Sequence, residues 1–163
     1  MTRFQLLDWS TVLPHLLDLS VAYVLALPIG WSQEREGSNA GLRIFPLVAI
    51  ASCGLILLAK EILPDNLEGQ ARIVQGLING IGFIGGGAIL RSEQSVHGKV
   101  TAASVWTVGV IGAAAGFGLY DIAAVLGVTN FATLRLLYLL YPLKKAITRA
   151  GKAERAKSSG STE

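Results

Sequence analysis

Charged and polar side chains with the chemistry to bind an ion gather in two short segments of the sequence. The first segment holds Glu34, Arg35, Gly41 and Arg43, and the second holds Arg91, Glu93, His97 and Lys99, followed by Thr101 and Ser104. Carboxylates in such segments can hold a hydrated Mg²⁺, which needs only one or two of them. Ordinary solvated charge pairs, worth about 0–1 kcal/mol each, explain the same residues. The spacing therefore indicates candidate polar sites but does not select magnesium over no metal.

Two further polar residues, Asp18 and Asn79, fall inside apolar runs. A carboxylate within a membrane is costly and is often functional. Asp18 could line an ion path, or it could lie near the outer interface, satisfied by His15 or by lipid headgroups. We expect Asn79 to be the most buried strongly polar group, either in an interhelical hydrogen bond worth about 0.6 kcal/mol or in contact with a ligand or ion.

The sequence offers no nucleophile paired with a base, so we expect no enzyme and no cofactor. His15 and His97 are predicted on opposite sides of a membrane, and the single cysteine, Cys53, lies in an apolar run. The segment 80–85 matches Gly-x-Gly-x-x-Gly, but it lacks the flanking strand and the acidic residue of a dinucleotide site. No basic motif of a nucleic-acid-binding protein is present, so nucleic acid is not an expected partner.

The elements that must position these residues are long apolar helices. Hydrophobic residues make up 52% of the chain and charged residues 15%, against about 25% charged in soluble domains. The apolar runs predict an all-α, polytopic membrane helical bundle of about five transmembrane helices. The expected spans are 12–31, 44–63, 73–90, 101–120 and 122–142, in one transmembrane domain over 1–142, followed by a short basic cytoplasmic tail over 143–163.

The distribution of positive charge predicts the orientation of this bundle. With five spans and the C-terminus inside, ten Lys and Arg residues fall in the inner segments and three in the outer ones. Positive charge marks cytoplasmic segments, so we expect the N-terminus outside and the C-terminus inside.

A glycine-rich stretch over 76–87 is the expected centre of the bundle. Gly76 and Gly80 are four residues apart, and the same spacing recurs at Gly82 and Gly86 and, in the fourth span, at Gly112 and Gly116. Small residues at this spacing let two helix backbones approach closely. We therefore predict a contact between the third and fourth spans, with the other spans arranged around the third.

Four blocks of the sequence resemble the MgtC/SapB family of bacterial inner-membrane proteins. They are Pro28-Ile-Gly-Trp-Ser-Gln-Glu-Arg-Glu-Gly with Ala40-Gly-Leu-Arg, Pro46-Leu-Val-Ala, Gly80-Ile-Gly-Phe-Ile-Gly-Gly-Gly-Ala-Ile-Leu-Arg, and Val100-Thr-Ala-Ala-Ser-Val-Trp with Gly112-Ala-Ala-Ala-Gly-Phe-Gly. Gln33 stands where the family often has Arg, and Ile44 stands where it often has Thr. The resemblance marks Glu34, Arg35, Gly41, Arg43, Asn79, Gly80, Gly82, Gly85, Arg91, Thr101 and Ser104 as candidate functional residues.

The resemblance implies a multi-pass protein of the inner membrane involved in magnesium homeostasis or adaptation to low magnesium. It implies action on or with other membrane proteins, with direct transport of Mg²⁺ or another ion as the alternative. The expected partners are the lipid bilayer and either other membrane proteins or a second copy docked through the glycine faces.

Overall fold

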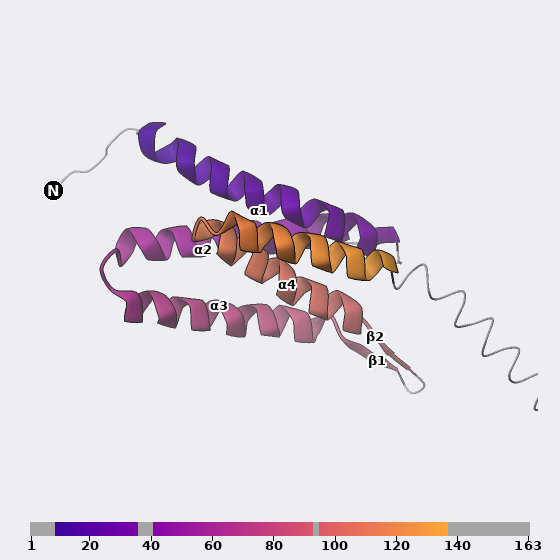
Figure 1. Ribbon diagram of the computed structural model, residues 1–163. Helices are drawn as coiled ribbons and strands as arrows, with labels where there is room; N and C mark the ends of the chain where they lie inside the picture. Colours follow the sequence, from indigo (N-terminus) through magenta and orange to yellow (C-terminus); the bar gives the residue numbers. More distant parts are fainter. Residues whose placement is uncertain (1–8, 36–40, 93–94, 137–163) are drawn as a thin grey trace, which may run out of the picture.

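The protein folds as a bundle of helices (Figure 1). The structure is a computed structural model, and it describes residues 9–35, 41–92 and 95–136. In chain order the elements are α1 (Trp9–Arg35), α2 (Gly41–Ile62), α3 (Leu67–Gly87), β1 (Leu90–Ser92), β2 (Ser95–His97), α4 (Lys99–Gly116) and a further helical segment over 120–136. The predicted all-α bundle is confirmed. The predicted tail over 143–163 and the end of the fifth expected span lie outside the described residues.

The helices extend beyond the predicted spans at the first charged segment. Glu34 and Arg35, expected in a loop, lie in the last turn of α1, and Gly41 and Arg43 lie in the first turn of α2. The second charged segment also differs, because Arg91 and His97 lie in a two-stranded antiparallel hairpin that joins α3 to α4. A polar segment next to an apolar run can continue the helix or form a hairpin through its own backbone hydrogen bonds. Hydropathy alone therefore does not show at which residue a helix ends.

Three helices within the described part of the chain are long and apolar enough to cross a membrane, namely α1, α2 and α4. The third helix begins at Leu67, before the expected start at residue 73, and it therefore includes Glu68, Gln70 and Arg72. These polar residues make α3 less apolar than the predicted span over 73–90.

The tightest packing joins α2 to α4 and α1 to α2, where glycines allow one backbone to touch another. A Cβ atom at Gly112 would collide with the carbonyl oxygen of Ala49, and one at Gly116 would lie 2.8 Å from the carbonyl oxygen of Cys53. Where α1 meets α2, a Cβ atom at Gly30 would lie 2.9 Å from the carbonyl oxygen of Gly41. The core of the bundle therefore lies between α1, α2 and α4, and it includes Ala26, Ile29, Phe45, Ala49, Val108 and Ile111.

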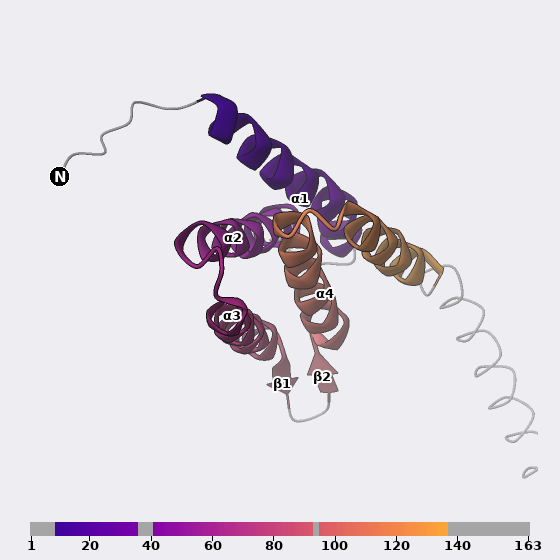
Figure 2. The ribbon, with the colours of Figure 1, turned by 60° about the vertical axis from the view of Figure 1, so that its left-hand side comes forward.

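The prediction that the third helix is the centre of the bundle is wrong. Figure 2 shows α3 at one side, with α4 between α2 and the helical segment 120–136. Only Ile81 and Gly85 are buried on α3, whereas Gly76, Gly80, Gly82 and Gly86 have open space where a Cβ atom would stand. The small-residue spacing is present, but nothing in it specifies which side of the helix a neighbour covers.

The predicted contact between the third and fourth helices is confirmed at two other places. Ile81 packs against Gly109, and Gly85 lies against the backbone of Ala102, where a Cβ atom would stand 3.3 Å from the carbonyl oxygen. The contact thus uses one glycine from each helix, and neither belongs to the glycine pairs singled out from the sequence.

Replacing Gly112 by alanine is expected to lower the free energy of unfolding by about 1–3 kcal/mol, since the new methyl group meets backbone that cannot rotate away. Gly80→Ala is the matched control, because Gly80 faces open space and alanine favours helix by up to about 1 kcal/mol. The measurement is unfolding in detergent micelles, followed by circular dichroism. Equal stabilities for the two variants would contradict the assigned core.

Candidate polar site between α1, α4 and the helical segment 120–136

Four neutral polar side chains from three elements form a hydrogen-bonded chain that we call the Gln33 cluster: Gln33, Thr101, Ser104 and Asn130. Thr101 Oγ1 donates to Gln33 Oε1 at 3.0 Å, and Gln33 Nε2 donates to Ser104 Oγ at 3.4 Å. Ser104 Oγ then donates to Asn130 Oδ1 at 3.3 Å. Gln33 is only 2% exposed, so its carboxamide depends on these partners rather than on water.

The helix geometry explains how the cluster assembles. Thr101 and Ser104 are three residues apart and share a face of α4, as the sequence predicts, and this face meets Gln33. Gln33 lies seven residues after Ala26 and four after Ile29, which are both buried, so it continues the buried face of α1. That spacing was the available signal for Gln33, which the sequence reasoning noted only as a departure from the family pattern. Asn130 has a similar signal, since it lies seven residues after Ala123 and four before Leu134, which are both buried.

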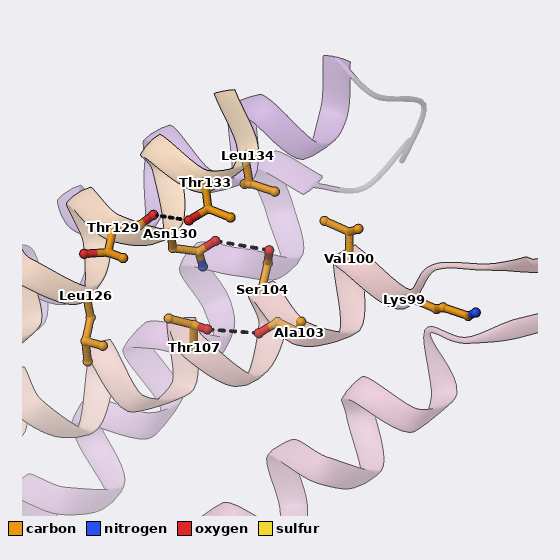
Figure 3. Close-up of a pocket in the computed structure, with 10 residues that line it drawn as sticks. All are labelled: Lys99, Val100, Ala103, Ser104, Thr107, Leu126, Thr129, Asn130, Thr133 and Leu134. Carbon is orange, nitrogen blue, oxygen red and sulfur yellow. Dashed lines mark hydrogen bonds between the residues drawn. The ribbon is translucent and has the colours of Figure 1, made fainter. Parts of the chain in front are cut away.

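A cavity of about 480 Å³ lies beside the Gln33 cluster, between α4 and the helical segment 120–136 (Figure 3). It is lined by Lys99, Val100, Ala103, Ser104, Thr107, Leu126, Thr129, Asn130, Thr133 and Leu134. The hydroxyls of Thr107 and Thr133 donate to carbonyls of their own helices, at 3.0 and 2.8 Å. Within the described residues, the buried Nδ2 of Asn130 has no hydrogen-bond partner, so it can donate to a group that enters the cavity.

The first charged segment holds helix ends together. Glu34 Oε2 accepts a hydrogen bond of 2.8 Å from the backbone N–H of Leu42, which satisfies a free donor in the first turn of α2. The Arg35 guanidinium lies 4.2 Å from the ring centre of Trp31, within cation–π range, and Arg135 lies 5.7 Å from the same ring. These contacts give Glu34 and Arg35 structural partners close to the joint between α1 and α2.

The two charged segments form no common metal site within the part of the chain that the structure describes. Among the described residues, no three His, Cys, Asp or Glu side chains lie close enough to hold a metal ion. Arg43 is exposed at the start of α2, and Glu93 lies outside the described residues. Of the candidates in the second segment whose side chains the structure describes, Thr101 and Ser104 join the Gln33 cluster.

Asp18 is buried, at 8% exposure, and its carboxylate accepts a hydrogen bond from the Tyr120 hydroxyl. Among the described residues, the hydrogen-bond partner of this carboxylate is therefore Tyr120 and not His15. At the same end of the bundle, Lys60 Nζ donates to the carbonyl oxygen of Gly116 at 3.1 Å, at the last turn of α4. A cation at a helix C-terminus is stabilised by the free carbonyls and the helix dipole.

The prediction that Asn79 is the most buried strongly polar residue is also wrong, because Asn79 is exposed on α3. Gly80 and Gly82 are exposed with it, whereas Gly85 is buried against α4. The error has the same origin as the misplaced centre: α3 faces its neighbours with Ile81 and Gly85, so the Asn79 side of the helix lies outside the contact.

Removing the Ser104 hydroxyl is expected to destabilise the protein by about 1–3 kcal/mol, because the bridge between Gln33 and Asn130 is lost and buried groups are left unpaired. Thr107→Ala serves as the control and should change stability by less than about 0.5 kcal/mol, since its hydroxyl bonds only its own helix. Unfolding of Ser104→Ala and Thr107→Ala in the same detergent gives the comparison. If Ser104→Ala loses no more stability than Thr107→Ala, the Gln33 cluster does not stabilise the bundle.

The relatives found by comparison with known proteins come from bacteria. The model of the MgtC family matches residues 19–143. An uncharacterized protein of Synechocystis is 37% identical over 74% of this chain and 49% of its own length. Protein MgtC of Salmonella typhimurium strain LT2 is 36% identical over 66% of this chain and 45% of its own. Escherichia coli K12 YhiD, named as a proposed magnesium transporter, is 29% identical over 77% of this chain and 61% of its own.

No solved structure matches the chain. The chain spans about half to three fifths of the length of these curated relatives. The family match nevertheless covers α2, α3 and α4 entirely, and with them both the Gln33 cluster and the cavity. On this extent of similarity, and on a helical bundle with three membrane-length apolar helices, the chain is a membrane protein that belongs to the MgtC family.

Proposed function

We propose that this protein is a non-enzymatic, multi-pass protein of the bacterial inner membrane that acts in magnesium homeostasis or adaptation to low magnesium by associating with another membrane protein. Membership of the MgtC family supports the link to magnesium, since one relative is named as a proposed magnesium transporter. The proposal requires the bilayer and a protein partner, with neither a cofactor nor nucleic acid. The excess of Lys and Arg on the expected inner segments supports an outside N-terminus and an inside C-terminus.

The observation that carries the partner proposal is the open side of α3. Phe83 is 85% exposed, and Ile78 and Ile84 are exposed beside it. A groove of about 590 Å³ runs between α2 and α3, and its lining includes Leu47, Ala51, Leu55, Gly76, Gly80 and Ile84. An apolar surface that faces lipid is normal for a membrane protein. Glycines on such a surface lack side chains, so they allow the backbone of a second helix to approach closely.

The groove has the features of a seat for a transmembrane helix of a partner. Gly76 and Gly80 are one helical turn apart, and apart from the adjacent residues and backbone of α3 itself, no atom lies within 4 Å of the place where a Cβ would stand at either glycine. A partner helix can approach this side of α3 closely, gaining van der Waals contact that the bilayer does not supply equally well. Asn79, exposed next to Gly80, offers that partner an amide for an interhelical hydrogen bond.

Substituting leucine for Gly80 should block the groove without disturbing the core, because the new side chain enters open space. We expect Gly80→Leu to lose both growth at low magnesium and the partner that a photo-crosslinker placed at Leu47 captures in native membranes. Gly86→Leu is the matched control, because Gly86 also faces open space on α3 but does not line the groove. Capture and growth that are the same for both variants, with both proteins folded and inserted, would refute docking at this groove.

Direct ion transport is the second candidate, and the burial of Asp18 in an apolar helix favours it. A buried carboxylate within a membrane-length helix is a common element of ion paths. The hydrogen bond from Tyr120 explains the burial of Asp18 equally directly, because this bond connects α1 to the start of the segment 120–136.

Flux measurements on purified protein in liposomes separate the two candidates. The partner proposal predicts no Mg²⁺ flux above protein-free liposomes and unchanged low-magnesium growth for Asp18→Asn, since asparagine still accepts the Tyr120 hydrogen bond. Mg²⁺ flux that Asp18→Asn abolishes would establish transport in place of the partner proposal.

A further inference from the structure

The cavity between α4 and the segment 120–136 has a lysine at its edge and a surface that is mostly apolar, although Ser, Thr and Asn side chains also line it. Lys99, the first residue of α4, lies at this edge with its side chain directed away from the other lining residues, and Val100, Ala103 and Leu126 supply apolar surface (Figure 3). Among the described residues that line it, none is Asp or Glu. The local charge therefore favours an anionic ligand, and the walls favour an apolar one.

The position of the cavity relates these two preferences to a bilayer. Because α4 is one of the membrane-length helices, its first residue lies toward a membrane surface, and Thr107 and Leu126 lie deeper. Lysine at such a helix end reaches the headgroup region. The cavity thus has the same order of polarity as a lipid, with charge at the surface and hydrocarbon below.

Asn130 supplies the third feature. Its Oδ1 is engaged by Ser104, while its Nδ2, buried beside the cavity, has no acceptor among the described residues. A buried donor without an acceptor is costly, and in native proteins it is normally satisfied by protein, water or ligand. An ester carbonyl of a lipid, which lies just below the headgroup, has the chemistry to accept this hydrogen bond.

We propose that this cavity binds a phospholipid with an anionic headgroup, which Lys99 recognises while Asn130 donates to an ester carbonyl and an acyl chain covers Val100, Ala103 and Leu126. A volume of about 480 Å³ is within the range of about 300–1,000 Å³ that is usual for ligand pockets. The inference is independent of the partner proposed for α3, because the two cavities share no lining residue.

Native mass spectrometry of the full chain in detergent tests this site with phosphatidylglycerol and phosphatidylcholine of identical acyl chains. We expect phosphatidylglycerol to be retained about fivefold more strongly, the preference that one lysine gives to one anionic headgroup, and Lys99→Gln to abolish it. Ala103→Phe should displace both lipids by filling the cavity, whereas Ala132→Phe, on an exposed position outside the lining, should leave binding unchanged.

Arg72→Gln is the control for charge, because Arg72 is exposed on α3 and pairs with Glu68 there. Equal retention of the two lipids, or a preference that Arg72→Gln removes as well as Lys99→Gln, would overturn the proposal. Full competition by glycerol phosphate would also overturn it, because the headgroup alone would then account for binding. If Ala103→Phe does not fold, Lys99→Gln still decides the outcome, since Lys99 is exposed.

Discussion

The contact between the backbones of α2 and α4 is the constraint on which the other features of this bundle depend. Gly112 lies directly on the carbonyl of Ala49, and Gly116 lies on that of Cys53 one turn further along both helices. Helices in a bilayer gain little from the hydrophobic effect when they associate, so close van der Waals contact must hold them together. Once α2 and α4 are fixed, α1 is fixed as well, because Gly30 meets Gly41 at the start of α2.

Hydrogen bonds of polar side chains stabilise this arrangement of helices at both ends of the bundle. At one end the Gln33 cluster links α1, α4 and the segment 120–136 through neutral hydrogen bonds. At the other end Asp18 accepts from Tyr120, and Lys60 donates to the carbonyl of Gly116. Buried polar groups fix an arrangement because any displacement leaves them unpaired. The segment 120–136 is therefore held at two places along its length, which keeps a cavity open between it and α4.

The sequence was sufficient to predict the class of fold, the approximate position of the helices and the family, because these depend on local apolar runs and on contiguous motifs. The spacing of Thr101 and Ser104 is also sufficient to place them on one helical face, since three residues make nearly one helical turn. It did not predict the exposure of Asn79 and Gly80, because the side of α3 that meets α4 depends on Ile81 and Gly85 finding Gly109 and Ala102. The partners of Asn130 and Tyr120 could not be predicted either, since each side chain is hydrogen-bonded to a residue on a helix distant in sequence.

In this bundle α2 and α4 form the buried centre, and α3 presents an open side. The most direct test introduces one cysteine at a time into the protein and measures its reaction with N-ethylmaleimide in detergent, with the native, buried Cys53 as internal reference. We expect a cysteine in place of Phe83 on α3 to react rapidly, whereas one in place of Val108 on α4 should react as slowly as Cys53. Rapid reaction at position 108 together with protection at position 83 would contradict this arrangement.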